Sequence, residues 1–136
     1  MTARDRVESS FARQGMMRTL GARVAHVGEG TVRIEAEVSE ATSQQQGAGH
    51  AGLTFALADS AAGYAALTIL APEQEVVTSE FRISLLAPAT GRLVAEGRVI
   101  RPGRRLVAVA ADVWAGDVLV ATALGTMVPV AVQPDG

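Results

Sequence analysis

The chain has 136 residues, 49% hydrophobic and 4% aromatic, which suits one domain with a core of Ala, Val and Leu. A formal charge of -2 argues against a dedicated nucleic-acid surface, and the absence of cysteine excludes disulfides, thiolate metal sites and a cysteine nucleophile. With two histidines and no carboxylate-rich set in the sequence, we expect no metal site. The polar N-terminus lacks an apolar signal core, which predicts a cytoplasmic protein.

The N-terminal part of the chain is predicted to hold a short helix and a β-hairpin. Over residues 4–20, apolar residues recur at roughly helical spacing with a break at Gly15, which indicates a short helix packed on the outside. Residues 21–27 and 31–38 flank a Gly-Glu-Gly turn, and the second run alternates apolar with charged residues. Such alternation is typical of a half-buried strand, so the two runs are expected to pair.

A glycine-rich loop at residues 44–52 leads into the apolar stretch 53–70. This stretch contains no Lys or Arg, so a helix here would be apolar nearly all round and should be buried. The Ala-Pro pair at 71 and 72 predicts its end, because the residue before a proline is pushed out of helical conformation. We expect no membrane span, because Asp59 lies near the centre and no cluster of basic residues brackets the stretch.

Four runs with strand character follow this helix. They cover residues 76–86, 93–101, 105–114 and 118–130, and short turns separate them. Turns this short make neighbouring strands antiparallel. The prediction is a single α+β domain over residues 1–136, in which a five- to six-stranded antiparallel sheet wraps around one long central helix.

Asp59 is the candidate functional residue on the predicted helix. A carboxylate on an apolar helix must be paired, hydrogen-bonded or open to a cleft, because burying it alone costs several kcal/mol. The loop upstream contains Gly47, Gly49, His50 and Gly52, and the free N–H groups of a helix start favour negative charge. A helix carboxylate that simply reaches solvent or an arginine is the alternative.

Several short motifs follow one another along the chain: Leu20-Gly21-Ala22, the Gly-x-x-His-x-Gly loop at 47–52, Leu57-Ala58-Asp59, Val77-Thr78, Leu86-Ala87-Pro88, residues 97–105 and Gly125-Thr126. In order and spacing they resemble those of hotdog-fold thioesterases of the phenylacetate-pathway (PaaI-like) type, which act on acyl-coenzyme A. The resemblance implies a hotdog fold and hydrolysis of a thioester to a free acid and coenzyme A. It implies no cofactor, since coenzyme A is part of the substrate.

The resemblance also assigns roles to residues of the loop and the helix. Asp59 would be the base that activates water or the nucleophile that attacks the thioester carbonyl. The backbone N–H of Ala51 would be the oxyanion donor, provided that φ at this residue is negative, because many relatives have glycine here. His50 and Gly52 complete the loop, and His50 is expected to hold it by hydrogen bonds rather than to transfer protons.

Two further polar side chains are implied at the site. Gln44 would contact the thioester or the attacking water, with Gln45 and Gln46 as alternatives for the same place. Thr78 is predicted on the polar face of its strand, opposite Phe81, and the resemblance implies that a threonine here comes from the partner subunit to place water. An ordinary cross-strand threonine is the alternative.

Arg101, Arg104 and Arg105 place three cations at one turn, near the coenzyme A phosphates according to the resemblance; a solvated hairpin tip is the alternative. The last three strands carry Val, Ala and Leu on both faces, more apolar surface than one helix can cover. We therefore expect a homodimer with joined sheets that pairs again into a homotetramer.

Two other function classes stay open. A hotdog hydratase or dehydratase would need a different arrangement of His and acid, typically in a His-Phe-Pro loop that this sequence lacks. A non-catalytic acyl-coenzyme A binding or regulatory module would keep the pocket and the arginines but would need no Asp59.

Overall fold

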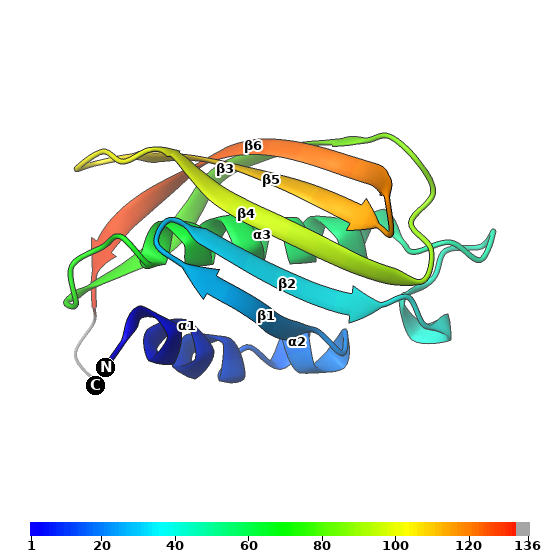
Figure 1. Cartoon of the computed structure of the whole chain (residues 1–136), viewed down its shortest axis with the longest axis horizontal. Helices are drawn as coiled ribbons and strands as arrows, with labels where there is room; N and C mark the ends of the chain where they lie inside the picture. The colour runs from blue at the N-terminus through cyan, green and yellow to red at the C-terminus, as the bar shows by residue number, and fades with distance from the viewer. Residues whose placement is uncertain (133–136) are drawn as a thin grey trace.

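The computed structural model describes residues 1–132, so the last four residues of the predicted domain lie outside the described part. Two N-terminal helices and a hairpin precede one long helix and four more strands (Figure 1). The helices are α1 (Ala3–Ala12), α2 (Gly15–Thr19), the short 3₁₀ helix η1 (Glu40–Thr42) and α3 (Ala51–Leu67). The strands are β1 (Arg23–Gly28), β2 (Thr31–Glu37), β3 (Gln74–Leu85), β4 (Arg92–Arg101), β5 (Val107–Ala115) and β6 (Val118–Ala131).

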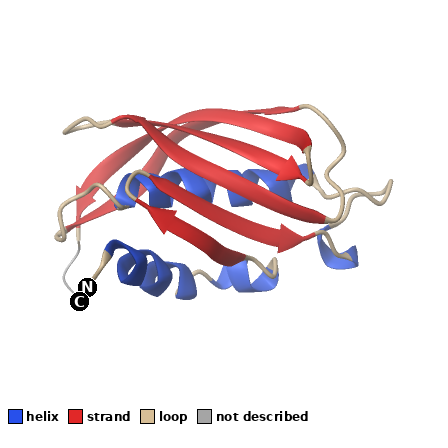
Figure 2. Cartoon of the chain, viewed as in Figure 1, coloured by secondary structure: helices blue, strands red, loops and turns tan. Residues whose placement is uncertain are grey.

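The six strands form one antiparallel sheet in the order β1-β2-β4-β5-β6-β3, and α3 crosses one face of it (Figures 1 and 2). On β2, Val32, Ile34 and Ala36 are fully buried beneath the helix, whereas the charged residues between them face away. The period-two pattern therefore gave the correct inner face. The predicted α+β fold with an antiparallel sheet around one central helix is confirmed, and the sheet has six strands.

The central helix α3 is buried along most of its length, as its apolar sequence predicts. It ends at Leu67, earlier than the Ala-Pro pair at 71 and 72 indicates. Beyond it the chain tightens into turns, in which the N–H groups of Ile69 and Leu70 donate to the carbonyl oxygens three residues back, both at 3.1 Å. Arg6 of α1 donates to the next free carbonyl oxygens, those of Leu70 and Ala71, at 2.8 and 2.7 Å. Within residues 1–132, no helix combines the length and the apolar character needed to cross a bilayer.

The N-terminal segment forms two helices rather than one interrupted helix. α1 already ends at Ala12, and Gly15 begins α2 instead of marking the break. Val7 of α1 is fully buried, and the Phe11 ring packs against Tyr64 of α3 with 6.2 Å between the ring centroids. The first helix is therefore docked next to the C-terminal half of α3.

Gly97 lies where β4 passes closest to α3. A Cβ atom placed on it would lie 2.2 Å from the carbonyl carbon and oxygen of Ala61. Only glycine fits such a crossing, so the backbones of strand and helix are in direct contact. Asp59 precedes Ala61 by two residues, and this crossing therefore sets the position of the helix turn that carries the carboxylate.

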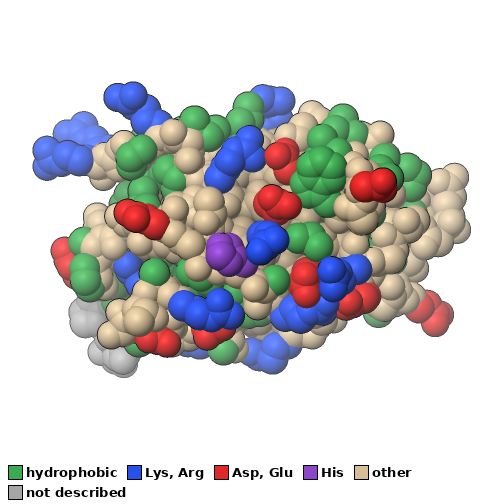
Figure 3. Space-filling model, viewed as in Figure 1, with side chains coloured by type: hydrophobic (Ala, Val, Ile, Leu, Met, Phe, Trp, Pro, Cys, Tyr) green, Lys and Arg blue, Asp and Glu red, His purple; other side chains and the backbone are tan. Residues whose placement is uncertain are grey.

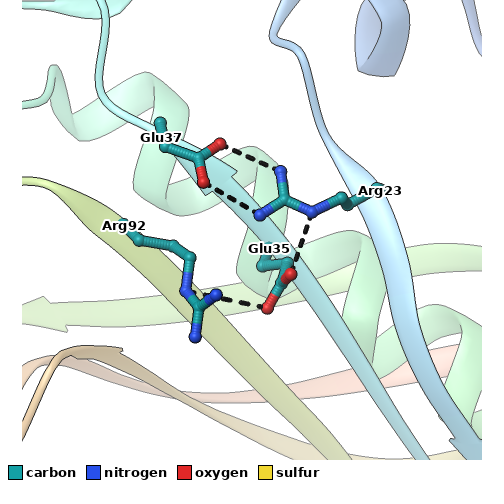
Figure 4. Close-up of polar contacts among 4 residues, drawn as sticks. All are labelled: Arg23, Glu35, Glu37 and Arg92. Atoms are coloured by element: carbon teal, nitrogen blue, oxygen red, sulfur yellow. Dashed lines mark hydrogen bonds and ion pairs between the residues drawn. The ribbon is translucent and has the colours of Figure 1, made fainter.

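Four charged side chains connect β1, β2 and β4 on the outer face of the sheet (Figure 4). Arg23 donates to Glu35 and to both carboxylate oxygens of Glu37, each at 2.9 Å, and Arg92 lies 4.0 Å from Glu35. The hydrogen bond from Arg23 lowers the pKa of Glu37. Exposed ion pairs contribute little stability, so we assign these residues to the pairing of the strands and not to a site.

Candidate active site

Two of the predicted site residues, Asp59 and Thr78, are in direct contact. Asp59 lies in the middle of α3, and the Thr78 hydroxyl on β3 donates a hydrogen bond to its Oδ1 at 2.8 Å. The same hydroxyl lies 3.4 Å from the sulfur of Met127 on β6. Both residues belong to one chain, whereas the resemblance implied a threonine from the partner subunit. The contact makes Thr78 a candidate for positioning Asp59 itself.

A β-bulge turns Thr78 toward the helix. The pairing of β3 with β6 shifts between Thr78 and Glu80, so one extra residue is inserted there. With strict alternation, the side chains of Thr78 and Phe81 would lie on opposite faces of β3, as the sequence predicted. The bulge instead places both side chains on the face toward the helix, so the predicted position of Thr78 is wrong. Phe81 packs edge-on against Phe55 of α3, with 5.4 Å between the ring centroids.

The Asp59 carboxyl group is half-buried, and this burial raises its pKa above the ordinary value for aspartate. The hydrogen bond from Thr78 acts in the opposite direction, because it stabilises the carboxylate. Among residues 1–132, Asp59 takes part in no ion pair, so it is not a helix carboxylate neutralised by an arginine. A carboxylate with a raised pKa is a better base, and such groups cluster at functional sites.

The loop before α3 leaves the Ala51 N–H without a partner in the helix. His50 is the N-cap, and its Nδ1 accepts a hydrogen bond from the Gly52 N–H at 2.8 Å, the loop-holding contact expected of it. Ala51 is the first helical residue, and no acceptor for its N–H is found in the described part of the chain. No described residue other than glycine has a positive φ, so the methyl group of Ala51 causes no backbone strain.

The side chain of Gln44 turns back into its own loop. Its Oε1 accepts a hydrogen bond from the Gln46 N–H at 2.5 Å, and the Gln44 N–H donates to the Ala48 carbonyl at 2.7 Å. Gln44 is half-buried, whereas Gln45 and Gln46 are exposed. In this conformation Gln44 stabilises the loop, and none of the three glutamines lines the cavity beside Asp59.

Within one chain, the predicted site residues do not meet at one point. Ala51 and Asp59 are eight residues apart on α3, a rise of about 12 Å at ~1.5 Å per residue. Figure 1 shows the loop that precedes α3 at one end of the molecule and the tip of the β4–β5 hairpin near the other. A single chain cannot place the Ala51 N–H and the Asp59 carboxylate on the same carbonyl group.

Arg101, Arg104 and Arg105 are all exposed at the tip of the β4–β5 hairpin. Figure 3 shows basic side chains projecting at that end of the molecule. None of the three is found in an ion pair within residues 1–132. Their guanidinium groups are therefore open to an anionic ligand.

A cavity of about 770 Å³ opens between α1, α3 and the strands β3 and β6. Asp59 and Thr78 lie on its wall together with Tyr64 of α3, and Ser10 and Gln14 contribute from the N-terminal segment. The volume falls within the ~300–1,000 Å³ of small-molecule sites. Sequence reasoning missed Ser10 and Gln14, because no local pattern connects them to a helix about fifty residues away. In the described part of the chain, no group of three or more His, Asp or Glu is placed to hold a metal ion.

Comparison with known proteins identifies the family. A profile of the thioesterase superfamily matches residues 46–122. A candidate esterase of Saccharolobus solfataricus is 36% identical over 102 residues, which cover 74% of this chain and 67% of that protein. The crystal structure of a thioesterase family protein from Silicibacter pomeroyi matches with a TM-score of 0.93 at 35% identity, over 96% of this chain and 99% of that one.

The PaaI protein of E. coli, from the phenylacetic acid degradation operon, matches with a TM-score of 0.87 over 95% of this chain and 94% of its own. At 20% identity this likeness shows the fold alone, and it agrees with the predicted hotdog architecture. The profile match covers more than half of the chain, and the relatives above 30% identity agree with it. The chain therefore belongs to the thioesterase superfamily and has the hotdog fold.

Proposed function

We propose that this protein is an acyl-coenzyme A thioesterase, which hydrolyses a thioester to a free acid and coenzyme A. The observation that carries the proposal is the Asp59 carboxylate, held by Thr78 on the wall of a ligand-sized cavity in a thioesterase-superfamily fold. A non-catalytic acyl-coenzyme A binding module would use the cavity but would gain nothing from a half-buried carboxylate, which has to be desolvated.

The proposed reaction needs few protein groups, because a thiol with a pKa near ~8.5 leaves readily as a thiolate. In one route, Asp59 accepts a proton from water while the water oxygen attacks the carbonyl carbon; the C–S bond then breaks and the sulfur takes up the proton. In the other, the carboxylate attacks the carbonyl carbon and the C–S bond breaks, which releases the coenzyme A thiolate and leaves an anhydride on Asp59. Water then hydrolyses the anhydride to the free acid and the Asp59 carboxylate, and the thiolate takes up the released proton. Both routes require the ionised form of Asp59.

The Ala51 N–H is the proposed oxyanion donor. It stands at the N-terminus of α3, where the helix dipole favours the negative charge that develops on the carbonyl oxygen. The Ala51 N–H lies about 12 Å along the helix from Asp59 of the same chain. We therefore propose that each active site combines Asp59 of one chain with the Ala51 N–H of a second chain.

The free edge of the sheet supports such a dimer. β3 is the terminal strand of the sheet and is 12 residues long, and an unpaired edge of this length favours pairing with another strand. On or next to this strand, the exposed fractions of Val77, Leu85 and Leu86 are 49%, 54% and 54%. The proposed unit is a homodimer with sheets joined at β3, which pairs again into a homotetramer. Light scattering that finds a monomer at micromolar concentration would contradict it.

Two inactive variants test the shared site. Ala51 is the first residue of α3, where proline is well tolerated, and His50 has φ -61° and ψ 144°, which suits a following proline. Ala51→Pro should therefore remove the donor while the helix still forms, and turnover should fall about 100- to 1000-fold. When this variant is co-expressed with Asp59→Asn, each heterodimer regains one intact site, and the mixture should recover about a quarter of the wild-type rate.

Each possible result of this experiment has a clear meaning. If purified heterodimers of two folded variants stay inactive, the two residues do not act across chains. Thiol release from a panel of alkyl and aryl coenzyme A thioesters tests the activity itself, and the lack of hydrolysis of every member would contradict the proposed function.

The three arginines at the hairpin tip are the proposed contacts for the coenzyme A phosphates. A guanidinium group matches phosphate geometry better than an ammonium group does, and Arg101, Arg104 and Arg105 are exposed at one turn. A coenzyme A thioester as substrate also fits the cytoplasmic location that the sequence predicts.

A further inference from the structure

The hydroxyl group of Thr78 has two acceptors within reach and only one hydrogen atom to donate. Besides Asp59 Oδ1 at 2.8 Å, the Sδ atom of Met127 lies 3.4 Å from the hydroxyl oxygen. A thioether sulfur is a weak acceptor, whereas hydrogen bonds to charged groups are roughly twice as strong as neutral ones. While Asp59 is ionised, the hydrogen therefore belongs to the carboxylate. The sulfur is then a second acceptor that the pair of Asp59 and Thr78 leaves unused.

The sulfur is held in its position by two strands and the helix. Met127 is fully buried, and it lies directly opposite Thr78 in the pairing of β3 with β6. On its other side it is paired with Val107 of β5. A Cβ atom on Gly63 of α3 would lie 3.9 Å from both Sδ and Cε, so the thioether also faces the helix one turn beyond Asp59. Neither side chain has to move for the hydroxyl hydrogen to turn from the carboxylate to the sulfur.

Both routes of the proposed reaction remove the negative charge of Asp59. The carboxylate either takes up a proton from the attacking water or becomes part of an anhydride, and in both cases it becomes a weaker acceptor for Thr78. A protonated Asp59 can also donate its own hydrogen to the Thr78 oxygen. The Thr78 hydrogen then needs another acceptor. Within residues 1–132, the Met127 sulfur is the acceptor recorded for it besides Asp59.

We propose that Met127 is a positioning residue of the active site, whose sulfur accepts the Thr78 hydrogen bond when Asp59 loses its charge. When the carboxylate is restored, the hydrogen bond returns to it. The exchange needs only a rotation of the hydroxyl group, and no covalent bond to the sulfur forms or breaks. The sulfur thereby stabilises the uncharged form of Asp59 that arises during the reaction. The inference rests on the proposed function and deepens it, because it adds a residue that acts through Thr78.

Burial and the hydrogen bond from Thr78, rather than a neighbouring charge, set the pKa of Asp59. The guanidinium of Arg6 is occupied by backbone carbonyl groups. The ionisable groups that share the cavity wall with Asp59 are the N-terminal residue Met1, Arg6, Arg13, Tyr64 of α3 and Glu75 of β3. Changes at Met127 and Thr78 leave all of these groups in place.

The test removes the sulfur and follows the titration of Asp59. Met127→Leu removes the acceptor with little change in volume, which cores tolerate best. NMR of ¹³C-labelled aspartate carboxyl groups measures the pKa of Asp59 directly, and Asp59→Asn identifies its signal. Without the sulfur the uncharged form loses a weak hydrogen bond, so the pKa of Asp59 should fall. The expected fall is about 0.4, which corresponds to ~0.5 kcal/mol at about 1.36 kcal/mol per pH unit.

The kinetics should change in the same direction. The acid limb of the kcat/KM profile of Met127→Leu should move to lower pH by the same amount as the pKa of Asp59. At neutral pH, kcat should fall by up to about 2.5-fold while KM stays unchanged, because the sulfur acts only after the charge has left Asp59.

Two controls show whether the effect passes through the Thr78 hydroxyl. Met17→Leu makes the same chemical change at a buried methionine of α2 outside the cavity, and it should leave turnover and the pKa of Asp59 unchanged. Thr78→Val has no hydroxyl hydrogen to redirect, so adding Met127→Leu to it should cause no further change in the pKa of Asp59. A methionine that only fills the core would alter stability in both backgrounds without this dependence on Thr78.

Norleucine incorporation gives a second measurement if Met127→Leu does not fold. It replaces the sulfur of each methionine by a CH₂ group and keeps the shape of the side chain. The pKa of Asp59 should fall in the norleucine-labelled wild type, and the same labelling of Thr78→Val should have no effect.

The outcomes separate the inference from the function on which it rests. Equal pKa values of Asp59 in the wild type and in the proteins without the sulfur would overturn the inference and leave the thioesterase function standing. A fall of the same size in Thr78→Val would also overturn it, because the sulfur would then act without the hydroxyl. If no thioester is hydrolysed, the proposed function fails and the catalytic role of Met127 fails with it, whereas the titration still decides whether the hydrogen bond is exchanged.

Discussion

Replacing Gly97 by alanine tests whether the contact between β4 and α3 positions the candidate carboxylate. The new Cβ would lie 2.2 Å from the Ala61 carbonyl group, whereas ordinary contact begins at 3.4 Å, so the helix or the strand must move by about 1.2 Å. Overpacking of this kind costs about 1–3 kcal/mol and occasionally more, and Tm should fall by roughly 4 °C for each kcal/mol. A 1 Å displacement of a catalytic group can lower the rate about 100-fold, so turnover should fall as well.

Thermal unfolding and thiol release on the same preparation measure both effects. Gly15→Ala is the matched control, because Gly15 is an exposed helical glycine whose Cβ would meet only Arg18 Nη2, at 3.6 Å. This control should leave turnover unchanged and should alter stability by no more than about 1 kcal/mol, in the stabilising direction. Wild-type Tm and turnover in Gly97→Ala would refute the idea that this crossing holds Asp59 in place.

Three other predictions concern the site. Thr78→Val should lower kcat/KM about tenfold, because a hydrogen bond to a charged group contributes ~1.5 kcal/mol or more. Thr78→Ser keeps the hydroxyl and should retain most of the activity. Equal rates for the two variants would show that the hydroxyl is not needed. Since burial raises the pKa of Asp59, the acid limb of the kcat/KM profile should lie above the usual range for aspartate, and Thr78→Val should move it further up by removing a donor to the carboxylate. Changing Arg101, Arg104 and Arg105 together to alanine should raise KM for coenzyme A thioesters several-fold with little change in kcat. The KM of the wild type should rise with salt. Equal KM values for the two proteins at low salt would show that these arginines form a solvated hairpin tip and do not bind the phosphates.

Features that repeat along the chain were predictable from the sequence. The alternation through Val32, Ile34 and Ala36 identified the inner face of β2, because burial in a strand follows a period of two. Asp59 was visible as the one carboxylate on an apolar helix, since a charge among buried side chains needs an explanation.

Features that depend on the pairing of distant segments were not predictable. The bulge after Thr78 has no glycine or proline to mark it and is defined only by the register of β3 on β6. Likewise, the hydrogen bonds of Tyr64 with Ser10 and Gln14 exist because α1 docks next to α3. The hydrogen bonds that Arg6 donates to the carbonyl oxygens after α3 also join segments more than sixty residues apart.

Asp59→Asn, measured in parallel for thiol release and for thermal unfolding, tests the central claim most directly. Asparagine keeps the shape of the side chain and can still accept the Thr78 hydrogen bond, but it cannot act as a base or as a carboxylate nucleophile. Because burial raises the pKa of Asp59, its charged form disfavours the folded state, and the stability it contributes is lost as pH rises through the folded-state pKa. The variant should therefore have a Tm at neutral pH equal to or above that of the wild type, and this gain should vanish at acidic pH. Its turnover should fall far below one tenth of the wild-type value. A folded Asp59→Asn protein that keeps more than about a tenth of that turnover would contradict the assignment of Asp59 as the catalytic group, because its activation barrier would have changed by less than ~1.4 kcal/mol.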